Sequence, residues 1–117
     1  MMMRAFLAVA ALGCGLSAFA EEKIELEGVY PPHLQGVATD GTSIFWSQTR
    51  EIVKTDGKGH PIGTTGRVSG HHGDLCCKDG LVYVAVNLGP FNRESGADSW
   101  VYGYRGDDLR FVRKWQL

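Results

Sequence analysis

Two stretches of this chain carry the same pattern of residues, 39 positions apart. The first runs from His33 to an Asp-Gly pair at 40–41, and the second runs from His72 to an Asp-Gly pair at 79–80. A run of β-branched and aromatic residues follows each pair. A repeat of about 40 residues with strand-like content is typical of a β-propeller, whose blades are four-stranded antiparallel sheets. The pattern therefore predicts an all-β chain, a partial β-propeller of about two blades.

Alternating apolar residues and turn residues predict the strands of both blades. The first blade is expected over residues 33–71, with strands at 36–39, 43–48 and 51–55 and an outer strand within 60–68. The second is expected over 72–117, with strands at 74–78, 81–86, 100–104 and 109–115. Residues 21–32 are predicted to hold a leading strand and a proline-rich connector. Residues 87–99, rich in Gly, Pro, Asn and Ser, predict a long loop, which in repeat proteins often carries binding residues.

The first 20 residues have the composition of a secretory signal peptide. Arg4 supplies a positive start, residues 5–12 form a short apolar run, and Ala18-Phe-Ala20 fits a small-x-small cleavage site. The apolar run is too short to span a bilayer as a helix. We therefore expect cleavage after Ala20 and a secreted or periplasmic protein. Lipidation at Cys14 is the alternative.

Charge and hydropathy exclude two classes of partner. The chain has 12 Lys and Arg against 13 Asp and Glu, and these basic residues form no cluster. A nucleic-acid partner is therefore not expected, because binding to phosphates needs a concentrated basic surface. No second apolar run predicts a membrane span in the mature chain.

Cys76 and Cys77 are adjacent and leave three interpretations open. Either one of the two cysteines is a small core residue on a strand, or the pair forms a strained vicinal disulfide, or the pair binds a metal. An exported protein meets an oxidising compartment, so a disulfide is permitted there.

Four polar residues are candidates for ligand binding. His33 and His72 precede the predicted inner strands, a position that lies at the mouth of the central channel of a propeller. Asp74 follows on the same face of an extended strand, and Asn87 ends the next strand. Imidazole, carboxylate and amide groups could hold a small ligand there. Alternatively, the repeated histidine hydrogen-bonds a neighbouring blade. The spacing matches no defined metal motif, so no metal ligand is assigned.

These segments resemble exported β-propeller proteins with NHL-like and SMP-30-like blades. The resemblance is carried by residues 33–41, 45–47, 52–56, 71–76, 82–87 and 100–102. Full-length members close about six blades into a ring. The resemblance therefore implies that this chain is the N-terminal part of a longer protein, truncated or fragmentary. It also implies binding of a small molecule or peptide at the channel mouth. Two blades leave an apolar face bare at each end, so self-association through the exposed blade faces is expected.

Two other functions remain open. SMP-30-like enzymes hold a divalent cation with Glu, Asn and Asp, and the resemblance offers only Asp74 and Asn87 as such ligands of a metal-dependent hydrolase. A structural or adhesive surface module would instead use the Gly-rich loop 88–99 or the turn at Arg105-Gly-Asp107.

Overall fold

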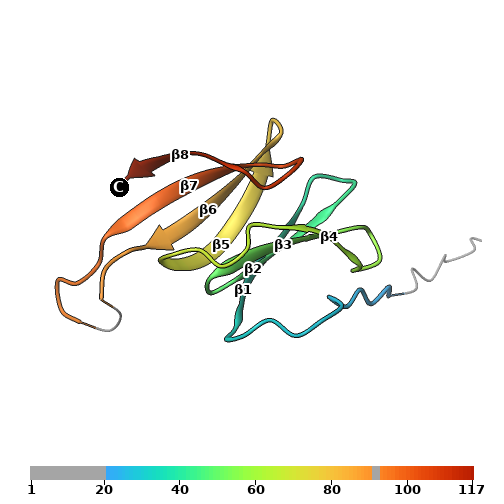
Figure 1. Cartoon of the computed structure of the whole chain (residues 1–117), viewed down its shortest axis with the longest axis horizontal. Helices are drawn as coiled ribbons and strands as arrows, with labels where there is room; N and C mark the ends of the chain where they lie inside the picture. The colour runs from blue at the N-terminus through green and yellow to red at the C-terminus, as the bar shows by residue number, and fades with distance from the viewer. Residues whose placement is uncertain (1–20, 91–92) are drawn as a thin grey trace, which may run out of the picture.

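The computed structural model describes residues 21–90 and 93–117, so the predicted signal peptide lies outside the described residues. Over this range the chain is all-β, with two four-stranded antiparallel sheets and no helix (Figure 1). The first sheet comprises β1 (Leu34–Thr39), β2 (Ile44–Gln48), β3 (Glu51–Thr55) and β4 (Pro61–Thr64), in that order. The second comprises β5 (His71–Lys78), β6 (Leu81–Asn87), β7 (Ser99–Arg105) and β8 (Phe111–Gln116), also in order.

Most strands lie within a few residues of their predicted positions, and β3 has the predicted bounds. The predicted leading strand is wrong, because residues 21–33 form no strand. This segment makes a backbone hydrogen bond from Glu27 N to the carbonyl oxygen of Gly59, at 3.0 Å. Pro31 and Pro32 then separate it from β1, and neither has an N–H to donate to a strand partner.

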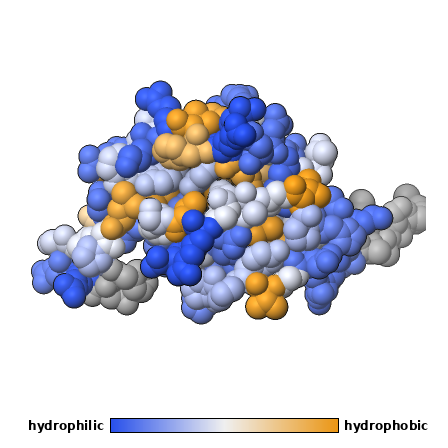
Figure 2. Space-filling model, viewed as in Figure 1, coloured by the Kyte–Doolittle hydropathy of each residue, from blue (hydrophilic) through white to orange (hydrophobic). Residues whose placement is uncertain are grey.

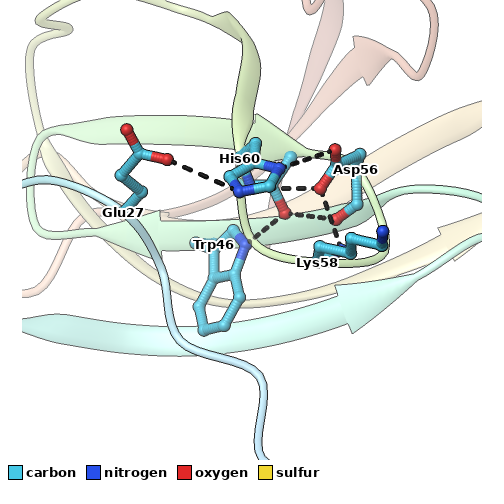
Figure 3. Close-up of polar contacts among 6 residues, drawn as sticks. Glu27, Trp46, Asp56, Lys58 and His60 are labelled. Carbon is cyan, nitrogen blue, oxygen red and sulfur yellow. Dashed lines mark hydrogen bonds and ion pairs between the residues drawn. The ribbon is translucent and has the colours of Figure 1, made fainter.

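A polar network at the turn between β3 and β4 holds the leading segment (Figure 3). The Asp56 carboxylate accepts from the backbone N–H groups of Lys58 and His60, at 2.8 and 3.0 Å, which lowers the pKa of Asp56. The His60 ring lies 3.2 Å from that carboxylate and 3.8 Å from Glu27. Trp46 Nε1 donates to the Thr55 hydroxyl, next to the same turn. The exposed ion pairs contribute little individually, so the turn itself is fixed mainly by the Asp56 hydrogen bonds.

Alternation along β2 and β6 explains why the sheets pack face to face. Phe45 and Ser47 project from one side of β2, and Val82 and Val84 project from one side of β6. All four are buried between the sheets. The shared core contains Phe45, Ile52, Leu75, Val82, Val84, Val86, Tyr104 and Leu109. Lys54 Nζ crosses between the sheets to donate to the carbonyl oxygen of Asp107, at 3.0 Å.

The inner strands β1 and β5 lie side by side and run in the same direction. Near the middle, Gly36 packs against Asp74, and the ends of the strands meet where Thr39 and Lys78 line a common pocket. At the surface, apolar groups are scattered between hydrophilic ones on the face that Figure 2 shows.

Gly36 is required for this close approach. A Cβ added at Gly36 would lie 2.8 Å from Asp74 Cα, a backbone atom that cannot rotate away. We expect Gly36→Ala to lower the free energy of unfolding by about 1–2 kcal/mol, as overpacking does. Gly57→Ala is the matched control, because a Cβ there meets nothing within 4 Å. Urea denaturation measures both, and equal stability of the two variants would contradict close packing of β1 on β5.

Candidate functional site

Thr49 joins the starts of the two inner strands. Its N–H donates to the carbonyl oxygen of His33 at 3.1 Å, and its carbonyl accepts from the N–H of His72 at 2.8 Å. Its hydroxyl accepts from Gln35 Nε2 at 3.2 Å. The structure therefore brings His33 and His72 to the same end of the sheets through the backbone of Thr49. Their side chains have different environments, since His33 is exposed and His72 is fully buried.

His72 is held as a neutral imidazole in the core. Its Nδ1 lies 3.4 Å from the carbonyl oxygen of Gly70, which can only accept, so Nδ1 carries the proton. Nε2 then accepts from the Tyr104 hydroxyl at 2.9 Å. Burial lowers the pKa of His72 because desolvation disfavours the charged form. Burial likewise raises the pKa of Tyr104 to about 12, so this phenol keeps its proton.

A cavity of about 240 Å³ opens next to Thr49. It is lined by Thr49, Arg50, Gly70, His71, Asn87, Leu88 and Gly89. Asn87 shapes it, because its Oδ1 accepts from the N–H groups of Gly89 and Asp98, both at 3.0 Å. Of the four predicted site residues, Asn87 lines this cavity, and His33 and His72 are linked to it through Thr49.

Asp74 lies apart from this cavity. It lines a separate hollow of about 290 Å³ with Cys76, Tyr83, Ala85 and Val101, among others. Its Oδ1 accepts from the backbone N–H of Leu75 at 2.8 Å.

A divalent cation does not fit the ligand set that the resemblance implies. Asp74 and Asn87 line different cavities, and both carboxylate and amide oxygens already accept backbone N–H groups. Within residues 21–90 and 93–117, no group of three or more His, Cys, Asp or Glu side chains converges as metal ligands would. We therefore derive no metal-dependent step.

Cys76 and Cys77 are free thiols on opposite faces of β5. Cys77 is half-buried towards the first sheet, and its pKa is raised by burial and by the charges of Asp40 and Cys76. A raised pKa keeps this thiol protonated and unreactive, as in a structural cysteine. Cys76 is exposed on the opposite face.

The turn at Arg105-Gly106-Asp107 packs against the first sheet. Gly106 N donates to the carbonyl oxygen of Gly80 at 2.8 Å, and Gly106 lines a pocket with Phe45. The carbonyl oxygen of Asp107 accepts from Lys54. The backbone of this tripeptide thus takes part in the contact between the sheets.

Sequence reasoning missed four residues of this region: Thr49, Arg50, His71 and Tyr104. Thr49 and Arg50 occupy a short predicted turn, and their proximity to β5 depends on how the sheets pack. Tyr104 is 32 positions from His72, so only the pairing of β5, β6 and β7 brings them together. A doubled histidine at 71–72 was the one local signal, because alternation places its two side chains on opposite faces.

Among the described residues there is no helix long and apolar enough to cross a membrane. No protein family, curated protein or solved structure matches the chain.

Proposed function

We propose that the two sheets are consecutive blades of an exported β-propeller, and that the cavity beside Thr49 binds a small anionic ligand at the channel mouth. The observation that carries this proposal is the convergence of Arg50, His71 and Asn87, from three separate segments, around one cavity. Export rests on the signal-like composition that ends at Ala20.

The pairing of the last two strands supports equivalent blades. Thr55 faces Pro61 across β3 and β4, with a one-residue shift directly beside it. Tyr104 faces Phe111 across β7 and β8, with the same shift at the same place. A bulge at a matching position is a conserved device for bending a strand, so its recurrence favours one blade plan used twice.

Counting strand pairs from these bulges sets the register of the repeat. Thr55 faces Ile44, and Tyr104 faces Val82, so Ile44 and Val82 occupy equivalent positions 38 residues apart. Each inner strand then lies beside the next inner strand, running in the same direction, as neighbouring blades do around a channel.

In this register His33 corresponds to His71, not to His72. The carbonyl oxygen of His33 accepts from Thr49 directly after β2, and His71 faces Asn87 at the end of β6. The equivalent histidines therefore both lie at the end of the blades where the proposed site is found.

The chemistry of the cavity favours a carboxylate or phosphate. The guanidinium of Arg50 is always charged and binds both anions through paired N–H groups. The Arg50 carbonyl accepts from Val68 N at 2.8 Å, which fixes the backbone behind the side chain. The cavity volume suits a small molecule rather than a folded partner.

Titration of the ¹⁵N-labelled full chain with succinate and with inorganic phosphate tests the site. We expect saturable shifts of the amide signals of Arg50, His71 and Gly89. Arg50→Ala should weaken binding at least tenfold, which is about 1.4 kcal/mol. Arg110→Ala, an exposed arginine in the last turn, is the matched control and should bind normally. Equal binding by both variants would rule out this cavity.

A further inference from the structure

One face of the second sheet packs against the first sheet, and its other face is uncovered. This open face comprises Cys76, Tyr83, Ala85, Val101 and Trp115. Each of these side chains is exposed or half-buried, whereas Val82 and Val84 on the covered face are at most 1% exposed. The Tyr83 and Trp115 rings lie 5.9 Å apart on it.

The equivalent face of the first sheet is covered by a neighbouring sheet, whereas the open face is not. In the register set by the bulges, Phe45 corresponds to Tyr83, Ser47 to Ala85 and Ile52 to Val101. Phe45, Ser47 and Ile52 are all 0% exposed, because the second sheet covers them. The open face therefore has the position and the apolar character of a surface that takes another sheet.

The first sheet has an exposed apolar surface on its far side along β1 only, because Trp46 and Val53 on that side are 8% and 1% exposed. Leu75, which packs the second sheet onto the first, corresponds to Val37. Val37 is 47% exposed, and Leu34 on the same side is 53% exposed. The leading segment beside this surface adds exposed Ile24 and Val29. We call this surface the outer face.

Charge also matches the two faces. The open face is edged by the exposed basic residues Lys78, Arg105 and Arg113. The leading segment beside the outer face carries the exposed acidic residues Glu21, Glu22, Glu25 and Glu27. Complementary charges steer association and disfavour a contact between two open faces, which would bring like charges together.

The contact between inner strands must be wider in such packing. Within the chain, a Cβ at Gly36 would lie 2.8 Å from Asp74 Cα. Gly36 and Asp74 are equivalent positions in the proposed register, so Asp74, which has a Cβ, would take the place of Gly36 against Gly36 of the next chain. The inner strands of the two chains would therefore lie further apart at this point than β1 and β5 do.

We propose that a second copy of this chain docks its outer face on the open face, so that copies associate head to tail. This inference rests on the proposed blade arrangement. Because the two surfaces differ, the contact is heterologous, and it extends to higher oligomers or closes into a ring.

Two exposed positions test the contact. Ala85→Arg puts a bulky charge at the centre of the open face, and Val37→Glu puts one on the outer face. In sedimentation velocity from ~1 µM to ~1 mM, the wild-type full chain should form oligomers and each variant should stay monomeric. Ala97→Arg, at an exposed alanine in the loop between β6 and β7, should associate like the wild type.

Mixing the two variants shows whether the open face of one copy binds the outer face of another. Each retains one intact surface, so an equimolar mixture should form dimers and nothing larger. Normal association of Val37→Glu would show an open-face dimer and overturn the proposal, as would a monomeric wild type. Nuclear Overhauser contacts between the Phe45 ring and Val82 in the monomeric variants distinguish failure of the self-association from failure of the proposed blade arrangement. If these contacts are present while the wild type is monomeric, the self-association alone fails; if they are missing, the blade arrangement fails with it.

Discussion

Truncation of Phe45 to alanine should be the most destabilising single change in the core. Phe45 is 0% exposed and belongs to the core shared by both sheets, next to the Gly106 turn. Its loss removes a large apolar surface and leaves a cavity between two rigid sheets, which typically costs about 3–5 kcal/mol. Domains of this size are stable by about 5–15 kcal/mol, so Phe45→Ala should remove between about a fifth and all of the folding free energy. Urea denaturation followed by tryptophan fluorescence measures the loss.

Phe111→Ala is the control for this change. Phe111 is 52% exposed and contacts the Tyr102 and Tyr104 rings at 5.3 and 5.9 Å between centroids. Its truncation should cost about 1 kcal/mol, as expected for surface aromatic contacts. If both variants lost the same stability, the main core would not lie between the sheets.

Local pattern was sufficient to predict the strands. Alternation, β-branched residues and Asp-Gly turns define where β2, β3 and β6 begin and end, since these signals act over a few residues. The leading strand was predicted on the same signal, with Ile24 and Leu26 alternating, but residues 21–33 lack the strand partners that would complete a sheet. Alternation reports a half-buried extended segment, and pairing is decided by neighbours far along the chain.

The equivalence proposed from the bulges differs by one residue from the alignment of the two Asp-Gly pairs, for a local reason. The two Asp-Gly pairs align in sequence, yet they occupy different places in their turns. The backbone N–H of Asp40 donates to the carbonyl oxygen of Ser43, and the equivalent pair in the second sheet is Lys78 and Leu81. Asp79 is therefore one residue further into its turn than Asp40 is, and its φ is 51°. A turn that differs by one place shifts every side chain to the other face, so His72 lies in the core while His33 is exposed.

The candidate site depended more heavily on tertiary structure. Asn87 could be predicted because it ends a strand. Arg50 and Thr49 could not, because a short turn between two strands does not indicate what it will contact. The pairing of Thr49 with both His33 and His72 is the consequence of β1 and β5 lying side by side.

Acidification should destabilise the protein through His72. Its folded pKa lies below the ordinary value of 6.5, so between these two values the unfolded chain binds a proton that the folded chain does not. The stabilisation is therefore complete above about pH 6.5 and is lost as the pH falls towards the folded pKa, at up to about 1.4 kcal/mol per pH unit. Asp40 and Asp56 also have lowered pKa values, but these carboxyls act below about pH 4, outside this window.

Replacement of His72 should remove this pH dependence along with much of the stability. His72→Gln disrupts the packed ring and weakens its contact with the Tyr104 hydroxyl, which should cost about 3 kcal/mol at pH 7.5. Since glutamine does not titrate, unfolding free energies of this variant should be flat between pH 6.5 and 5. His33→Gln, at an exposed histidine, is the matched control and should keep the wild-type slope. A His72→Gln variant with an unchanged slope would show that His72 binds its proton equally well in the folded and the unfolded chain, so burial of this ring would not be the source of the pH dependence.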